Sequence, residues 1–453
     1  MRLPELAGER VVIVGYGREG RAALERLAPV AGQLVVVDAS ERARSEVPEG
    51  IRAEASLDAV LMRSGTGVAV VSPGVPRVHP WRAQLAAAGW ATTSGSDLWF
   101  AENGARTIAV TGSKGKSTTS ALIAHLLRGL GESVAYGGNI GTPLLALPEA
   151  PGYVVEVSSF QASSLTSSPR IAVLTSLFPD HIDWHGDYER YVSDKLTLLA
   201  HAPHGVVVNA GDAELLAAVA ARYPHLPLRL APGPLTFHVA HGPGSQRTLL
   251  RGEDALFDLA GYAPPGVHNE ANLCLAFEAL LAWGVDPGRL PGLAEAVASF
   301  RPLPHRLETV AVLDGVAFVD DTLSTNPSAA VKALEAFADR PVALIVGGHD
   351  RGVDYEPLAA RLRRHPIAAL VTLPENGPRI AALARGGAAA VHSRETLREA
   401  VALAATLVPP GGVVLLSPAA PSYNAYASYE EKAQDFRDAV AVLATGSTGR
   451  TDR

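Results

Sequence analysis

The sequence predicts an α/β fold in which helices cover both faces of largely parallel sheets. Short runs rich in Val and Ile alternate along the chain with Ala- and Leu-rich stretches that are typical of helices. The runs are almost continuously apolar, which indicates strands that are buried on both faces. They lie at residues 11–15, 34–38, 67–74, 107–112, 153–159, 171–177, 205–210, 343–348 and 413–418.

The 453 residues suggest about three domains, at roughly 150 residues each. We expect a Rossmann-like domain over residues 1–95, a P-loop ATPase-like domain over 96–302 and a second Rossmann-like domain over 303–453, each built on a largely parallel sheet. The Pro-rich, charged stretch 301–308 is interpreted as the linker before the third domain. Between 228 and 262 the helical pattern lapses, which favours a small antiparallel insertion.

Composition excludes several classes of protein. The net charge of -7 gives no basic patch for a nucleic acid. A single cysteine allows no internal disulfide and favours a reducing compartment. The longest uncharged stretch, 400–429, is broken by Pro and Gly at 409–412, so it predicts a helix, a turn and a buried strand rather than a membrane helix. No signal-peptide pattern opens the chain, and we expect a cytoplasmic protein.

The first strand ends in a glycine-rich turn. Gly15, Gly17 and Gly20 have the G-x-G-x-x-G spacing of a turn that brings backbone close to a phosphate at a helix N-terminus. Asp38 ends the next strand, at the place of a ribose-binding acid. The alternative is a structural turn that binds no dinucleotide. A second strand-end turn, 71–76, either is structural or faces the same ligand.

A second glycine-rich loop, "TGSKGKST" at 111–118, follows the strand at 107–112 and precedes an Ala/Leu-rich helix. It is too short for the general P-loop pattern, but its context predicts phosphate binding by backbone N–H groups. Lys116 can reach the β- and γ-phosphates, and the Ser117 hydroxyl can coordinate Mg²⁺.

A magnesium–nucleotide site needs further ligands. Glu156 lies inside a buried strand, so its carboxylate must be paired or bound to a metal. His181 and His185 have the H-x-x-x-H spacing, but Ile182 replaces the glutamate of zinc proteases, and Pro179 and Gly186 indicate a loop. Lys195 lies on a helical stretch, where a lone lysine is usually a solvated surface group.

The last third of the chain has three polar strand-end loops. They lie at 318–330, 345–352 and 415–431. Ligands of α/β proteins bind at the carboxyl ends of parallel strands, so these loops are candidates for a binding site. Ordinary turns with capping residues are the alternative.

Taken together, these motifs resemble the Mur ligase family over nearly the whole chain. The segments that carry the resemblance are "TGSKGKST" (111–118), "GGNIGTP" (137–143), "DHID" (180–183), the lysine at 195, "HNEAN" (268–272) and "PHR" (304–306). Within that family, "EVSSFQ" (156–161) and the stretch that starts "LLSPAAPSY" (415–423) are similar to the branch that adds D-glutamate.

The resemblance implies a role for each matching residue. Lys116, Glu156, His181 and Lys195 would be catalytic, with Lys195 carbamylated so that a cation becomes a metal-binding anion. Two Mg²⁺ ions would be held by Ser117, Glu156, His181 and carbamylated Lys195. ATP would contact Gly112, Ser113, Lys114, Gly115, Lys116, Ser117, Thr118, Asn269, Arg306 and Asp321. The UDP-substrate would contact Gly15, Gly17, Asp38, Ser72, Gly74, Asn139 and His181, and D-glutamate would contact Arg351, Ser422, Tyr423 and Tyr429.

The chain departs from the family pattern at three positions. Lys114 replaces an asparagine of the phosphate loop, and we favour a phosphate-facing role for it over a solvent-facing one. Leu323 stands where a substrate-binding lysine is expected. Arg351 is one basic residue where the family has more, although a guanidinium can bind a carboxylate with two hydrogen bonds.

The implied activity is ATP-dependent addition of D-glutamate to UDP-N-acetylmuramoyl-L-alanine in peptidoglycan precursor synthesis, through an acyl phosphate and with release of ADP and phosphate. We expect a monomer. The alternatives are another amino acid ligase of the same family, an NAD-dependent oxidoreductase, and a nucleotide- or UDP-sugar-binding protein without chemistry.

Overall fold

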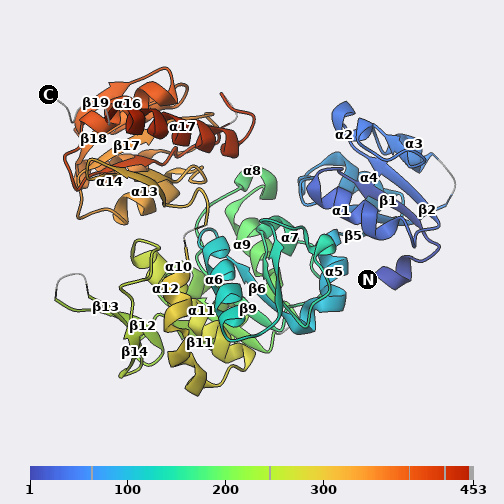
Figure 1. The fold of residues 1–453 in the computed structure, drawn as a ribbon. Helices are drawn as coiled ribbons and strands as arrows, with labels where there is room; N and C mark the ends of the chain where they lie inside the picture. Colours follow the sequence, from blue (N-terminus) through green and yellow to red (C-terminus); the bar gives the residue numbers. More distant parts are fainter. Residues whose placement is uncertain are drawn as a thin grey trace. The chain divides into compact units, whose positions relative to one another are not determined.

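The computed structural model describes residues 1–62, 65–201, 203–243, 246–301, 303–386, 388–422 and 425–447. The chain divides into two compact units (Figure 1). The first comprises residues 1–262 and 270–300, and the second comprises 263–269 and 301–453. The first two expected domains fall in the first unit, apart from residues 263–269 and 301–302, and the third falls in the second unit. Their boundaries remain predictions.

The N-terminal sheet of the first unit is fully parallel, with strand order β3-β2-β1-β4-β5. Its strands are β1 (Arg10–Val14), β2 (Gln33–Val37), β3 (Arg52–Glu54), β4 (Val68–Val71) and β5 (Ala91–Thr93). A short 3-10 helix η1 (Leu3–Leu6) precedes them, and the helices between and after them are α1 (Arg18–Leu27), α2 (Glu41–Ser45), α3 (Asp58–Leu61), α4 (Pro80–Ala87) and α5 (Gly95–Asn103).

The central sheet of the first unit is also fully parallel, with order β11-β10-β9-β6-β8-β7. Its strands are β6 (Thr107–Thr111), β7 (Val134–Gly138), β8 (Gly152–Glu156), β9 (Ile171–Leu174), β10 (Gly205–Asn209) and β11 (Leu228–Ala231). The helices of this part are α6 (Lys116–Gly129), α7 (Ser159–Ala162), α8 (Ile182–His185), α9 (Tyr188–Leu196), α10 (Ala213–Arg222), α11 (Val267–Trp283) and α12 (Ala294–Ser299), with 3-10 helices η2 (Gly104–Arg106), η3 (Leu144–Ala146), η4 (Thr197–Leu199) and η5 (Pro287–Leu293).

The predicted antiparallel insertion is present as a separate three-stranded sheet. It consists of β12 (Phe237–His241), β13 (Arg247–Arg251) and β14 (Asp254–Asp258). Its extent is shorter than expected, because β11, at 228–231, pairs in parallel with β10 and so belongs to the central sheet.

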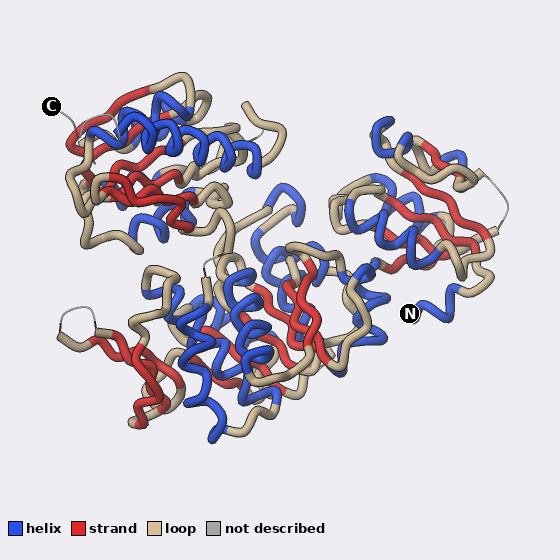
Figure 2. The backbone as a smooth tube through the Cα atoms, viewed as in Figure 1, coloured by secondary structure: helices blue, strands red, loops and turns tan. Residues whose placement is uncertain are grey.

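The second unit is built on a six-stranded sheet of order β15-β16-β20-β17-β18-β19, in which only β15 runs antiparallel. Its strands are β15 (Glu308–Leu313), β16 (Val316–Asp320), β17 (Val342–Val346), β18 (Ile367–Thr372), β19 (Ala388–Ser393) and β20 (Val413–Leu416). Its helices are α13 (Pro327–Glu335), α14 (Glu356–Arg364), α15 (Gly377–Leu383), α16 (Leu397–Thr406) and α17 (Tyr429–Ser447). Figure 2 shows the strands of each unit with helices packed alongside.

Strand burial explains the continuous apolar runs in the sequence. In β17, Leu344 and Val346 pack into the core on one face of the sheet, whereas Ala343 and Ile345 pack into the core on the other. Successive side chains of a strand point to opposite faces, so a strand covered on both sides is apolar at every position. The predicted α/β class, with several mostly parallel sheets, is confirmed.

Candidate active site

The phosphate loop lies between the end of β6 and the start of α6, as predicted. Gly112 has a φ of +150°, and a Cβ atom there would lie 2.0 Å from Oγ1 of Thr175. Gly115 has a φ of +88° and forms the N-cap of α6 without a side-chain hydrogen bond to the helix. Both positions therefore require glycine. Because no side chain caps α6, the N–H groups of its first turn are available to an anion.

Two lysines converge on this loop. The Lys116 ammonium donates to the carbonyl oxygens of Gly112, at 2.9 Å, and Ser113, at 3.2 Å. The Lys195 ammonium, from α9, donates to the same Gly112 oxygen at 2.9 Å. The sequence pattern favoured a solvated surface position for Lys195, but only 2% of the residue is exposed. The surface position suggested by the helical pattern is therefore wrong for Lys195.

Burial controls the protonation of Lys195. It lowers the pKa of this amine well below its ordinary value, and the nearby charge of Lys116 lowers it further, against the opposing effects of Asp180 and Glu156. The amine also lies 4.8 Å from the centroid of the Tyr191 ring. A neutral, buried amine is a nucleophile, whereas a solvated ammonium is not.

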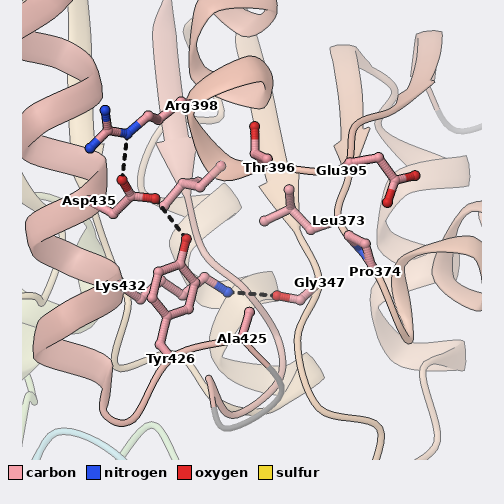
Figure 3. A pocket seen from close by; sticks show the side chains of 11 residues that line it. Gly347, Leu373, Pro374, Glu395, Thr396, Arg398, Ala425, Tyr426, Lys432 and Asp435 are labelled. Carbon is pink, nitrogen blue, oxygen red and sulfur yellow. Dashed lines mark hydrogen bonds and ion pairs between the residues drawn. The ribbon is translucent and has the colours of Figure 1, made fainter.

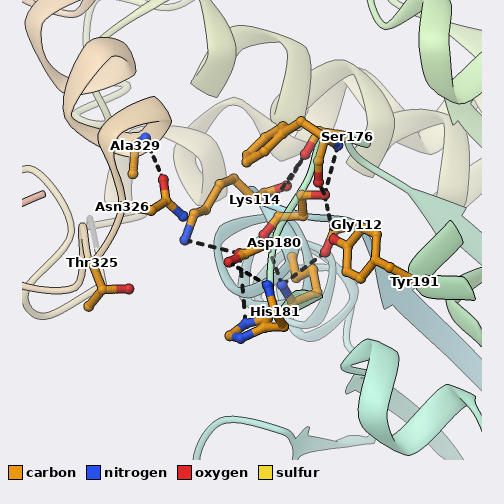
Figure 4. A network of polar contacts seen from close by, with 12 residues as sticks. Gly112, Lys114, Ser176, Asp180, His181, Tyr191, Thr325, Asn326 and Ala329 are labelled. Atoms are coloured by element: carbon orange, nitrogen blue, oxygen red, sulfur yellow. Dashed lines mark hydrogen bonds and ion pairs between the residues drawn. The ribbon is translucent and has the colours of Figure 1, made fainter. Parts of the chain in front are cut away.

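Lys114 extends toward the 179–187 segment rather than away from the protein (Figure 4). Its ammonium lies 3.9 Å from Oδ2 of Asp180, whose carboxylate also lies 3.7 Å from Nε2 of His181. Burial raises the pKa of Asp180, but the charges of Lys114, His181, Lys116 and Lys195 outweigh it, so that the net shift is downward. This carboxylate is therefore the local counter-ion of a strongly positive loop.

His181 adopts a left-handed backbone conformation, with φ of +55°, and precedes the one-turn helix α8. The sequence predicted a loop here, because Pro179 and Gly186 flank it; a single helical turn forms between them instead. Burial lowers the pKa of His181, and the three neighbouring lysines lower it further, against the effect of Asp180. The imidazole is thus biased toward the neutral form, which is the form that binds metals.

Glu156 ends β8, beside the strand that carries the phosphate loop, with Val110 as its register partner. It is 1% exposed. Its Oε1 accepts a hydrogen bond of 2.7 Å from the Asn139 side chain, whereas its Oε2 has no hydrogen-bond partner among the described residues. A buried carboxylate oxygen without a partner is costly unless a cation binds it. Together with the buried Ser117 hydroxyl on the first turn of α6, this oxygen gives a hard donor set that suits Mg²⁺.

The N-terminal glycine turn lies between β1 and α1, as predicted. Gly15 has a φ of +91°, and a Cβ at Gly20 would lie 2.1 Å from the Gly15 oxygen. Gly17 is the N-cap of α1 and provides no side-chain cap. The Ser72 hydroxyl, at the end of β4, donates to the Gly15 oxygen at 2.8 Å, so the two strand-end turns adjoin. Asp38 accepts the N–H of Tyr16 at 2.7 Å and therefore also faces this turn.

The three polar loops of the second unit meet at the carboxyl ends of adjacent strands β16, β20 and β17. The Ser417 hydroxyl donates to Asp321 at 2.8 Å, and the His349 N–H donates to the Pro421 oxygen at 2.8 Å. The Arg351 guanidinium donates to the Thr325 oxygen at 3.2 Å. The predicted convergence of these loops is therefore present within this unit.

The predicted glutamate-binding residues differ in how the structure places them. Arg351 is exposed, whereas the buried Ser422 hydroxyl has no hydrogen-bond partner among the described residues. Tyr429 begins α17, and its ring lies 5.7 Å from that of His305. Tyr423 lies outside the described residues. No measured distance places Ser422 and Tyr429 at one ligand, so this set remains a prediction.

Of the nucleotide-binding residues predicted in the second unit, Asp321 is the most constrained. Burial raises its pKa to about 6, against the hydrogen bonds from Ser324, Ser417 and Leu307 and the charge of Arg306. The Asn269 amide donates to the Pro265 oxygen at 2.7 Å. Leu307, which follows Arg306, donates its N–H to Asp321 at 3.3 Å.

A cavity of about 320 Å³ in the second unit was not predicted (Figure 3). Lys432 borders it, is 1% exposed, and donates to the Gly347 oxygen at 2.8 Å. Burial lowers the pKa of Lys432 to about 8. Among the described residues of the predicted glutamate-binding set, Arg351, Ser422 and Tyr429 do not line the cavity. Lys432 lies between Glu431 and Ala433 in the polar first turns of α17, so its neighbours in the sequence do not indicate its burial.

Sequence reasoning also missed a buried polar chain in the first unit. His185, named only as a failed zinc motif, makes a hydrogen bond to Asp194 through Nδ1, at 2.8 Å, and another to the Ser159 hydroxyl through Nε2, at 2.9 Å. Asp194 precedes Lys195 on α9.

Within the parts of the chain that the structure describes, no helix is long and apolar enough to span a membrane.

Comparison with known proteins identifies the family. The Mur ligase middle domain matches residues 110–228, and the Mur ligase glutamate ligase domain matches residues 305–420. Among solved structures, the UDP-N-acetylmuramate-alanine ligase of Thermotoga maritima has a TM-score of 0.61 at 19% identity, with 96% of this chain and 100% of that chain covered. At this identity the likeness shows the fold alone.

Two curated relatives cover almost the full chain. Each is named UDP-N-acetylmuramoyl-L-alanine--L-glutamate ligase. The one from Micromonospora sp. is 46% identical over 97% of this chain and 98% of its own length, and the one from Salinispora tropica is 46% identical over 97% and 99%. Both names contain glutamate, as expected from the sequence, but in the L rather than the D configuration. The chain belongs to the Mur ligase family.

Proposed function

We propose that the chain is an ATP-dependent ligase that joins glutamate to UDP-N-acetylmuramoyl-L-alanine in peptidoglycan precursor synthesis. The observation that carries the proposal is the phosphate loop, where Lys116 and Lys195 donate to one carbonyl oxygen. The charge of Glu156 acts on Lys195, and the buried Oε2 of Glu156 has no hydrogen-bond partner among the described residues. A carboxylate and a triphosphate repel each other, so a site that binds both must supply positive charge. Lysine side chains and oxygen ligands for a metal ion provide this charge.

We propose L-glutamate as the preferred enantiomer, in place of the D-glutamate expected from the sequence. The names of the two relatives support this choice. So does Leu323, which offers no charge at the position where the family pattern is expected to have a substrate-binding lysine.

The residues of the site divide between substrates. The amides of residues 112–118 and the Lys116 ammonium bind the phosphates of ATP, and Asn269, Arg306 and Asp321 contact the rest of the nucleotide. The N-terminal glycine turn binds the pyrophosphate of the uridine diphosphate rather than that of NAD. The residues proposed for this contact are Gly15, Gly17, Asp38, Ser72 and Gly74. Asn139 and His181 lie near the muramoyl-alanine, and Arg351, Ser422, Tyr423 and Tyr429 bind glutamate.

Two magnesium sites follow from the donor groups. Ser117 and Glu156 would hold one ion, and His181 with carbamylated Lys195 would hold a second. The neutral amine of Lys195 can react with CO₂ to give the carbamate, which replaces a repelling cation with a carboxylate-like ligand. Bound Mg²⁺ would neutralise the phosphates and the developing acyl phosphate.

The reaction has two displacement steps. A carboxylate oxygen of the alanyl group attacks the γ-phosphorus, the bond to the β-phosphate oxygen breaks, and ADP leaves. The glutamate amine then attacks the acyl carbon, loses a proton, and the C–O bond to phosphate breaks as the amide forms. Lys116 holds the γ-phosphoryl group in both steps.

The test is release of ADP and phosphate from ATP with UDP-N-acetylmuramoyl-L-alanine and a panel of amino acids. Release that depends on L-glutamate supports the proposal in full. Release with D-glutamate alone would contradict the preference for L-glutamate but would support the ligase activity. Release that requires L-lysine or diaminopimelate, or no release with any amino acid, overturns it.

A further inference from the structure

Asp194 joins three side chains next to Lys195, the α9 lysine that reaches the phosphate loop. It is 3% exposed and lies on α9, one residue before Lys195. Its Oδ2 contacts His185, and its Oδ1 lies 3.1 Å from the Arg77 guanidinium and 3.7 Å from that of Arg190. Two of these partners are local, since His185 belongs to α8 and Arg190 to α9. Arg77 lies in the segment between β4 of the N-terminal sheet and α4.

The chain of contacts continues beyond His185. Its Nε2 lies 2.9 Å from the hydroxyl of Ser159, at the start of α7. Serine, histidine and aspartate thus stand in sequence, but all three are buried, so the serine is not accessible as a nucleophile. What the chain does is fix α7, α8 and α9 against one another through hydrogen bonds that are strong in a buried setting.

The segment that carries Arg77 is anchored at its start, at Ser72 and Pro73. Ser72 begins it and donates to the Gly15 oxygen of the glycine turn, at 2.8 Å. The Trp184 indole of α8 donates to the Pro73 oxygen at 3.1 Å. Residues 72–79 therefore connect the turn that binds an anion with the helices that bear His181 and Lys195.

We propose that Arg77 and Asp194 are positioning residues that couple occupancy of the Gly15 turn to the placement of Lys195. This inference rests on the proposed function, in which that turn binds the uridine diphosphate. A uridine nucleotide that orders residues 72–79 also orders Arg77, and the ion pair then holds α9, and Lys195 with it, against the phosphate loop. The coupling is reciprocal, as linkage requires.

The contrast between the two arginines gives a matched experiment. Arg77 is 33% exposed and reaches Asp194 from another sheet, whereas Arg190 is 50% exposed and reaches the same carboxylate from its own helix. Arg77→Gln and Arg190→Gln each remove one positive charge from the surroundings of Asp194. Only Arg77→Gln breaks the connection to the glycine turn.

We expect Arg77→Gln to raise KM for UDP-N-acetylmuramoyl-L-alanine about 10-fold and to lower kcat several-fold, with KM for ATP within about 2-fold of wild type. Arg190→Gln stays within about 2-fold in all three constants, and Arg77→Lys restores most of the loss. If Arg77 contributed to stability alone, Arg77→Gln would lower the melting temperature without changing the ratio of KM for UDP-N-acetylmuramoyl-L-alanine to KM for ATP. Equal effects of the two glutamine variants, or no effect of Arg77→Gln, would overturn the proposal.

A double-mutant cycle checks that the two residues act as a pair. If they do, Asp194→Asn adds little to the KM change in an Arg77→Gln background, and additive changes contradict the coupling. Failure of the proposed function is distinguishable, because wild type would then turn over neither enantiomer of glutamate. In that case binding of UDP alone, by calorimetry, still decides: weaker binding to Arg77→Gln than to Arg190→Gln supports the coupling, and equal binding refutes it.

Discussion

Lys116 and Lys195 donate hydrogen bonds to the same acceptor, the Gly112 carbonyl oxygen, each at 2.9 Å. Two ammonium groups that share one oxygen repel each other, and the buried one loses its proton more easily. The arrangement therefore prepares Lys195 for chemistry that an ordinary helix lysine cannot undergo. In the proposed function, Lys116 remains the cation that binds the phosphate.

Lys195→Ala should lower kcat by at least about 100-fold, because the proposed second magnesium site would lose its carbamate ligand. Short carboxylic acids that fit the vacated space should restore part of the activity. In wild type, carbon-13 NMR after incubation with labelled bicarbonate should show a carbamate resonance that is absent from the variant. Full activity of Lys195→Ala without added acid would contradict this role.

Glu156→Gln should raise the Mg²⁺ concentration for half-maximal activity by at least about 10-fold and lower kcat by about 100-fold. Glutamine keeps an oxygen for the Asn139 amide but removes the negative charge from the atom that has no partner among the described residues. The melting temperature should not fall, since a buried neutral amide is less costly than a buried charge. A magnesium titration measures the effect. Glu149→Gln, which alters an exposed carboxylate paired with Arg106, is the control and should titrate like wild type.

Lys114→Asn should raise KM for ATP about 3- to 10-fold, with a smaller dependence of KM on salt. Its ammonium belongs to the positive loop next to Asp180, and charge near a phosphate contributes on the order of 1 kcal/mol at low ionic strength. Kinetics at two salt concentrations measure this. Lys332→Asn, which removes an exposed lysine paired with Glu335, should leave KM for ATP unchanged. An unaltered KM for Lys114→Asn at low salt would assign Lys114 no phosphate role.

Leu323→Lys should shift the ratio of kcat/KM for the two glutamate enantiomers toward D-glutamate. Leu323 is half-buried in the loop after β16, where an ammonium would add a carboxylate partner that leucine cannot provide. Competition between labelled L- and D-glutamate gives the ratio directly. Leu323→Met, with a similar volume and no charge, is the control. An unchanged ratio in the lysine variant would remove Leu323 from the determinants of configuration.

The phosphate loop and the glycine turn could be predicted from sequence because their chemistry is local. The glycine pattern marks the positive φ angles of Gly112 and Gly115, and the strand before each loop has an apolar pattern of its own. The atom that leaves no room for a Cβ at Gly112 belongs to the distant Thr175, which the sequence does not indicate. The burial of Lys195 could not be predicted in this way. It depends on the packing of α9 against a loop 83 residues earlier in the chain.

The same limit applies to the contacts of Asp194. A carboxylate on a polar helix face is usually solvated, and nothing near it in the sequence indicates that Arg77 approaches from another sheet. The loop predicted between Pro179 and Gly186 was wrong for a related reason. A turn of helix formed there because Trp184 and His185 have buried partners in distant segments, Pro73 and Ser159.

Asp321→Asn should stabilise the second unit at pH 7, and this gain should vanish below about pH 4. Burial raises the pKa of Asp321 to about 6 in the folded chain, so between about pH 4 and 6 the folded state holds more proton than the unfolded state does. Wild-type stability therefore falls as pH rises through that range, by at most about 3 kcal/mol for a shift of about two units. Asparagine has no such charge to bury, and the hydroxyls of Ser324 and Ser417 can rotate to accept from its amide. Hydrogen exchange of the β16 and β20 amides at pH 4 and pH 7 measures the difference, and equal protection of wild type and variant at pH 7 would show that the buried carboxylate carries no such cost.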